Sequence, residues 1–234
     1  LIASDATFTI SSDASFNSVT VGKGANSVAG NTVLGESALD AAVTGGKNTA
    51  IGYSALGANT SGTNAVAVGY NALASNTTGL YNVAVGMDAL LQNTTANNNV
   101  AVGMRSMFVN TTGTNNIGVG FFTLNQNTTG SSNVAIGSQA LDANTTASNN
   151  TAVGQVALGA NTTGTFNTAV GSAALDANTT ASNNNAFGYG SLTNNTTGGN
   201  NCAFGRDALN ENQTANNNSA FGHNALKSNT TGAQ

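Results

Sequence analysis

The side chains best placed to do chemistry in this sequence are asparagines that recur at a fixed spacing. Asn followed by any residue and then Ser or Thr is the acceptor pattern for N-linked glycans. It occurs at Asn59, Asn76, Asn93, Asn110, Asn127, Asn144, Asn161, Asn178, Asn195, Asn212 and Asn229. We take all of these except Asn59 and Asn212 as candidate glycan acceptors. The alternative interpretation is structural: amides stacked in a column can donate to one neighbour and accept from the next. We favour this alternative, because stacking uses the column whether or not glycans are attached.

Aromatic side chains form a second candidate surface. Tyr53, Tyr70, Phe121, Phe122 and Tyr189 are expected to point outward. Such rings could stack on the sugars of a host surface, or they could pack between coils or subunits, and packing is the favoured interpretation. The recurrent Thr residues raise a third possibility, an ice-binding face on which Asn and the second Thr of each Asn-Thr-Thr lie together.

The composition argues against catalysis and nucleic-acid binding. Of 234 residues, 6% are charged, against about 25% in a typical soluble domain. His223 and Cys202 are each the single residue of their type, which leaves little material for acid–base or nucleophilic chemistry and indicates no metal or cofactor site. There is no basic patch for phosphates and no long apolar run. We therefore expect a protein that is not an enzyme, with no nucleic-acid partner and no membrane insertion.

A strict internal repeat organises the chain. Taking the Gly of Asn-x-Ala-Val-Gly as a reference, every copy begins 17 residues after the last, without insertion or deletion. The reference glycines are Gly35, Gly52, Gly69, Gly86, Gly103, Gly120, Gly137, Gly154, Gly171, Gly188, Gly205 and Gly222. We call the residues at one position of all copies a column. Because loops tolerate changes in length, a constant period indicates copies stacked in one register.

Two apolar columns are expected to form the interior. One stands directly before the reference Gly, from Leu34 to Phe221, and the other four residues after it, from Leu39 to Leu226. In this interpretation Phe187, Phe204 and Phe221 enlarge the core column near the C-terminus. Between these columns stand small residues, mostly Ala.

The elements that would position these columns are short strands. Asn-Thr-Ala-Val-Gly is brief, β-branched and ended by Gly, which is typical of a strand and a turn. Asn-Thr-Thr-Gly follows too soon for a helix. The sequence predicts an all-β fold, a parallel β-solenoid with 17 residues per coil. Each coil would hold two short strands, or one strand and an extended arc. Twelve coils at the strand spacing would form a rod of roughly 58 Å.

An outward apolar stripe in the middle of the chain predicts an interface between subunits. Val66, Val83 and Val100 stand three residues before the reference Gly, and Tyr53 and Tyr70 stand one residue after it. A thin single stack gains from neighbours. We therefore expect a homo-oligomer, a parallel homotrimer.

The chain divides into three segments. Residues 1–18 are expected to be a lead-in segment or linker, and residues 19–30 a degenerate first coil or an N-terminal cap. Residues 31–234 form the twelve-coil array, expected to continue in a longer chain.

These residues carry a family resemblance. Val21-Gly22-Lys23-Gly24-Ala25, followed by tandem Asn-Thr-Ala-Val-Gly-x-x-Ala-Leu-x-x-Asn-Thr-Thr-Gly, resembles the repeat arrays of bacteriophage tail fibres and adhesin-like proteins over residues 19–234. It resembles more loosely the head repeats of trimeric autotransporter adhesins, which form left-handed β-rolls. The resemblance implies a trimeric fibre outside the cell or on a virion surface, and it supplies no catalytic residues.

The expected function is therefore mechanical. The chain would be the structural shaft of a tail fibre or surface adhesin, holding a receptor-binding tip for host attachment. One alternative is an adhesin module that itself binds a host cell-surface glycan or receptor. The other is an ice-binding β-solenoid.

Overall fold

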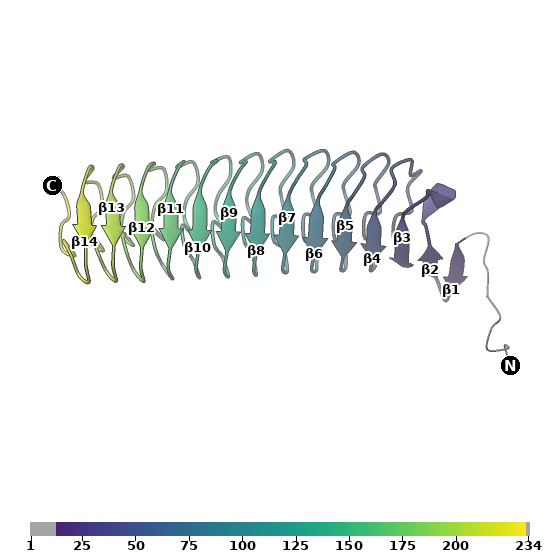
Figure 1. The fold of residues 1–234 in the computed structure, drawn as a ribbon, viewed down its shortest axis with the longest axis horizontal. Coiled ribbons are helices and arrows are strands. Elements are labelled where there is room, and N and C mark those ends of the chain that lie inside the picture. Colours follow the sequence, from purple (N-terminus) through teal and green to yellow (C-terminus); the bar gives the residue numbers. More distant parts are fainter. Residues whose placement is uncertain (1–12, 233–234) are drawn as a thin grey trace.

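The structure is a computed structural model that describes residues 13–232, and in this part of the chain it is an all-β rod (Figure 1). A single 14-stranded sheet runs along the rod in sequence order. Its strands are β1 Ala14–Phe16, β2 Val19–Gly22, β3 Thr32–Gly35, β4 Thr49–Ile51, β5 Val66–Val68, β6 Val83–Val85, β7 Val100–Val102, β8 Ile117–Val119, β9 Val134–Ile136, β10 Thr151–Val153, β11 Thr168–Val170, β12 Asn185–Phe187, β13 Cys202–Phe204 and β14 Ser219–Phe221.

The parallel β-solenoid predicted from the repeat is confirmed. From β3 onward each strand pairs in parallel with the next, and the paired residues are 17 apart, as in Val83 with Val100 and Ala84 with Ala101. Each coil contributes one strand, and the rest of the coil follows turns and bends. Twelve parallel strands correspond to about 11 turns.

An antiparallel hairpin covers the N-terminal end of this stack. β2 pairs antiparallel with both β1 and β3, and a 3-10 helix at Ala25–Ser27 connects β2 to the first coil. Of the two alternatives predicted for residues 19–30, the structure therefore has the N-terminal cap and not a parallel coil. The lead-in segment or linker predicted for residues 1–18 lies outside the described residues as far as residue 12.

The interior is narrower than the sequence suggested. The Leu column four residues after the reference Gly is buried as expected, from Leu39 to Leu209, with Met107 in one copy. The expectation that the column directly before the Gly also points inward is wrong. Leu34 is 46% exposed and Phe221 is 70% exposed, whereas the neighbouring Ala column, two residues before the Gly, is fully buried in most coils.

The physical reason is the two-residue period of a strand. In Val-Ala-Val the two Val side chains point to the same side and the Ala to the other. The Ala must face inward, because the tightly wound coil has room there only for a small side chain. The Val, Ile and Phe residues on both sides of it therefore face out. Phe187 and Phe204 accordingly stack on the outer surface, with ring centroids 5.4 Å apart.

Candidate functional site

The glycan-acceptor asparagines lie inside the rod, where they form a continuous chain of hydrogen bonds. From Asn76 to Asn229, the side-chain nitrogen Nδ2 of each donates to the Oδ1 of its counterpart one coil earlier, for example Asn144 to Asn127 at 2.8 Å and Asn161 to Asn144 at 3.1 Å. The same Nδ2 donates to the backbone carbonyl three residues later, as Asn144 does to Ala147 at 3.1 Å. We call this column, Asn59 to Asn229, the amide ladder.

This geometry contradicts the glycosylation interpretation for the folded chain. Glycans attach to Nδ2, and in the amide ladder this atom is a buried donor with two acceptors. The affected candidates are Asn76, Asn93, Asn110, Asn127, Asn144, Asn161, Asn178 and Asn195, all fully buried, and Asn229, which is partly buried and donates to Gly232 and Asn212. The structural alternative, a stacked Asn column, describes them correctly.

A second Asn column stabilises the backbone of neighbouring coils. These residues stand four before the reference Gly, as in Asn133 and Asn150. The Oδ1 of Asn133 accepts from the backbone nitrogen of Asn150 at 3.0 Å, and the Nδ2 of Asn150 donates to the carbonyl of Gly164 at 2.8 Å. Buried amides are tolerable only when they are paired in this way. The side chains of both Asn columns therefore link neighbouring coils by buried hydrogen bonds.

The five aromatic candidates do lie at the surface, but most have a ring face already covered. Tyr53 and Tyr70 stack on one another with centroids 5.3 Å apart and planes 11° from parallel. The rings of Phe121 and Phe122 are 4.3 Å apart, and the Arg206 guanidinium lies 5.5 Å from the Tyr189 ring centre. Tyr53, Tyr70, Phe121 and Tyr189 share one column but lie in three separate stretches of the rod, because only Tyr53 and Tyr70 are in adjacent coils, so they do not converge on a pocket.

The most exposed apolar surface was only partly anticipated. The mid-chain stripe faces outward as predicted, but the column directly before the Gly, including Phe187, Phe204 and Phe221, was expected inside and lies outside. The alternation of a small residue between two larger ones in each strand was the available signal, because it marks one inward and two outward positions.

Charged side chains form only small local groups in the described residues. Arg105 lies 3.6 Å from Asp88, and Asp207 lies within 3.3 Å of Arg206 and 4.0 Å of Lys227. Within residues 13–232 no three His, Cys, Asp or Glu side chains are grouped to hold a metal ion. The same residues include no helix long and apolar enough to cross a membrane.

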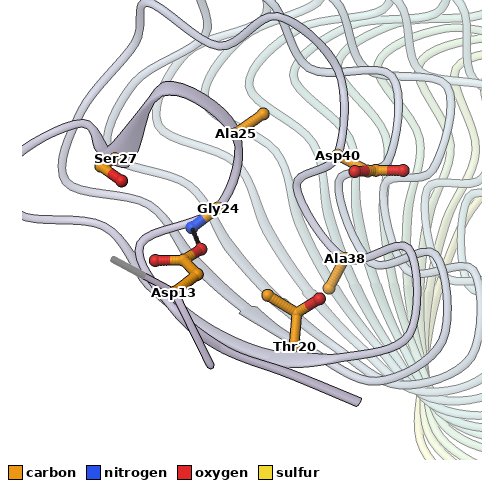
Figure 2. Close-up of a pocket in the computed structure, with 7 residues that line it drawn as sticks. All are labelled: Asp13, Thr20, Gly24, Ala25, Ser27, Ala38 and Asp40. Carbon is orange, nitrogen blue, oxygen red and sulfur yellow. Dashed lines mark hydrogen bonds between the residues drawn. The ribbon is translucent and has the colours of Figure 1, made fainter. Parts of the chain in front are cut away.

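A shallow hollow lies between the N-terminal hairpin and the first coil (Figure 2). It measures about 350 Å³ and is lined by Asp13, Thr20, Gly24, Ala25, Ser27, Ala38 and Asp40. The Asp13 carboxylate accepts from the backbone nitrogens of Lys23 at 2.7 Å and Gly24 at 2.5 Å. Asp13 therefore fixes the turn that closes the cap.

The half-buried carboxyl of Asp142 makes the stability of the rod depend on pH. Burial raises the pKa of Asp142, and a hydrogen bond with the Asn125 side chain partly opposes this; Oδ1 of each residue has no partner. A raised folded-state pKa means that folding favours the protonated acid. This contribution is present at pH values below the unfolded pKa and is lost as pH rises through the folded one. Asp142→Asn should therefore stabilise the rod at pH 7, by less than about 1 kcal/mol because solvent screens a half-buried group.

The gain should shrink toward zero at pH 3, where Asp142 itself is protonated. Urea unfolding at both pH values measures the difference. Asp40→Asn is the matched control, since Asp40 occupies the same column in the first coil but is exposed. An equal gain from Asp142→Asn at pH 3 and pH 7 would contradict this explanation.

In comparisons with known proteins, no family model, no curated protein and no solved structure matches this chain.

Proposed function

We propose that this chain is a structural shaft, the rod of a tail fibre or surface adhesin outside the cell or on a virion. It holds a receptor-binding tip away from its base and so serves host attachment. The role is mechanical and not catalytic. The observation that carries the proposal is the unbroken register, in which every coil from β3 to β14 repeats the same backbone pairing.

The hydrogen bonding explains why such a rod would be stiff. Backbone hydrogen bonds join each strand to the next, and the amide ladder runs through the interior. In the second Asn column, backbone nitrogens donate to the side chain of the Asn one coil earlier, as that of Asn150 does to Asn133. Bending the rod would stretch the hydrogen bonds between coils on its convex side. Identical neighbouring coils also let such a shaft be lengthened by whole coils, as in other repeat proteins.

A sugar-binding adhesin module is less well supported by the aromatic side chains. Sugars stack on ring faces, but Tyr53 and Tyr70 each use one face to stack on the other.

An ice-binding face has one observation in its favour. The second Thr of each Asn-Thr-Thr is exposed in eight successive coils, at Thr78, Thr95, Thr112, Thr129, Thr146, Thr163, Thr180 and Thr197. The Asn predicted to share this face is instead buried, and the first Thr turns its hydroxyl to the next coil, as Thr128 does to the carbonyl of Thr145 at 3.0 Å. One regular Thr column remains, so ice binding is our second candidate.

An in-phase deletion tests the shaft. Removing residues 100–150 takes out 51 residues, three whole coils, and joins Asn99 to Thr151 in the native register. We expect a folded rod shortened by about 14 Å from an original length of about 62 Å, measured by electron microscopy. Removing residues 100–147, a deletion of 48 residues, should unfold the junction because the columns no longer align.

Two outcomes would contradict the shaft. A compact particle whose length does not follow the number of coils would show that the chain is not a rod. A separation of freezing and melting points in solution, with ice faceted by the protein, would favour the second candidate.

A further inference from the structure

Most of the exposed large hydrophobic side chains of the described residues gather on one side of the rod. Most occupy outward strand positions or the column that follows the reference Gly: Leu34, Tyr53, Tyr70, Met87, Ile117, Val119, Phe121, Ile136, Tyr189, Phe204 and Phe221. Phe16, Val19 and Val21 extend this surface onto the hairpin, since Val21 pairs with Leu34 and Phe16 with Val19. Tyr81 and Phe166 are the two exceptions: they are exposed two residues before a strand, in the column that also holds Asn149. We call this surface the apolar sheet face.

The face carries no charge along most of its length. Neither outward strand position holds Lys, Arg, Asp or Glu in any of the twelve coils. The column after the Gly is also uncharged from Tyr53 to Tyr189. Soluble proteins rarely expose a long apolar patch, and such a patch marks a site of association.

We infer that a second copy of this chain covers the apolar sheet face, so that two rods pair face to face about a two-fold axis. The inference rests on the proposed shaft and names its partner. Only a partner with the same spacing between coils can fit side chains into this face over its whole length, and a copy of the chain has that spacing by construction. Dry packing of matched side-chain columns is known from stacked sheets.

The area of the face is sufficient for a stable pair. Fourteen strands at the strand spacing span about 62 Å, and the outward columns span about 13 Å, which gives roughly 800 Å² per copy. Stable complexes bury about this area on each partner. The sheet also presents its strands side by side along the entire rod, without a gap (Figure 1).

The geometry favours two copies over the three expected from the sequence. A single face that contacts the same face of a partner closes the assembly after one contact. A ring of three requires two different contact surfaces on each chain. Outside this face the rod offers the exposed Thr column, with Thr129 as one member, and none of the exposed large hydrophobic residues of the described chain stands in that column.

Charges placed on each side of the rod test the pairing. The face variant carries Val85→Lys, Val119→Lys and Val153→Lys, in alternate coils so that the new charges are not adjacent. The control carries Thr95→Lys, Thr129→Lys and Thr163→Lys, which lie in the same three coils in the exposed Thr column. Sedimentation equilibrium measures the mass of each protein, and circular dichroism verifies that each is folded.

We expect the unmodified chain and the control to have twice the chain mass of 23.0 kDa. The face variant should have the mass of one chain, with a dissociation constant raised about 100-fold or more, since an unpaired charge resists burial. A mass of one chain or of three for the unmodified protein would overturn the inference, as would a folded face variant that still pairs. A monomeric or trimeric rod of the expected length would leave the shaft proposal intact.

Methionine oxidation gives a test that needs no variant. Met87 lies on the face and is 43% exposed, whereas Met107 is fully buried inside the coil and serves as the internal reference. Pairing should slow the peroxide oxidation of Met87 about tenfold as protein concentration rises, while Met107 stays protected throughout. Oxidation of Met87 at a rate independent of concentration, up to concentrations well above that needed for pairing, would count against the inference.

Discussion

Replacing Asn144 by Asp is expected to lower the free energy of unfolding by about 3–5 kcal/mol at pH 7. Asn144 is fully buried, donates to Asn127 and Ala147, and accepts from Asn161. A carboxylate keeps the acceptor but removes both donors, so that its oxygens face two other oxygens. It also places an unpaired charge inside the rod. Although it replaces only the NH₂ group of one side chain by oxygen, this substitution should be among the most destabilising in the chain.

Asn149→Asp is the matched control. Asn149 lies five residues later in the same coil, is exposed, and has the positive φ that Asn and Asp both tolerate. It should change the free energy of unfolding by less than about 0.5 kcal/mol. Urea unfolding of both variants measures the effect, and the loss from Asn144→Asp should diminish on acidification, because a protonated carboxyl regains one donor. Equal, small effects at the two positions would show that the amide ladder is not a principal source of stability.

Replacing Gly120 by Ala is expected to cost about 3–5 kcal/mol. Gly120 has a φ of 139°, which residues with a side chain rarely adopt. An added Cβ would lie 2.8 Å from the backbone carbonyl carbon and oxygen of Gly137 in the next coil. Neither backbone can move without breaking the register, so strain and overlap add together.

Gly57→Ala separates this effect from the general consequence of replacing glycine. Its new Cβ would meet nothing closer than 3.3 Å, and its φ is not positive. We expect it to change the free energy of unfolding by less than about 1 kcal/mol, because alanine restricts the unfolded chain while its Cβ lies against the backbone oxygens of Ser54 and Ser37. Thermal unfolding compares the two variants, and similar melting temperatures would contradict the close stacking of the reference glycines.

Sequence reasoning recovered the features that depend on exact repetition. The constant interval between reference glycines allows only stacked coils of equal size, and the strand character of residues such as Val100–Val102 then gives a parallel solenoid. The Leu column and the two Asn columns could also be located, because a buried column must hold the same type of side chain in each coil. A column of like charges would repel, which is why charged residues are so few.

The direction of the strand side chains could not be derived in the same way. Both Val residues of Val-Ala-Val are apolar, so hydrophobicity alone suggested that one of them formed the core. The inside of the coil is limited by backbone that turns sharply at Leu124 and its counterparts, where φ is near 50°. Leucine rarely adopts a positive φ, and no pattern in the sequence predicts one at this position. This turn brings Leu into the interior and leaves room for only Ala on the strand.

Protection of the Asn side-chain amides from hydrogen exchange tests the account most directly. In a sample with ¹⁵N-labelled Asn, the buried amides of the two Asn columns should retain their protons in D₂O long after exposed residues such as Asn115 and Asn149 have exchanged. We predict a large set of slowly exchanging amide groups that disappears only when the rod unfolds. Fast exchange of all Asn side chains in the folded protein would contradict the amide ladder and the solenoid built around it.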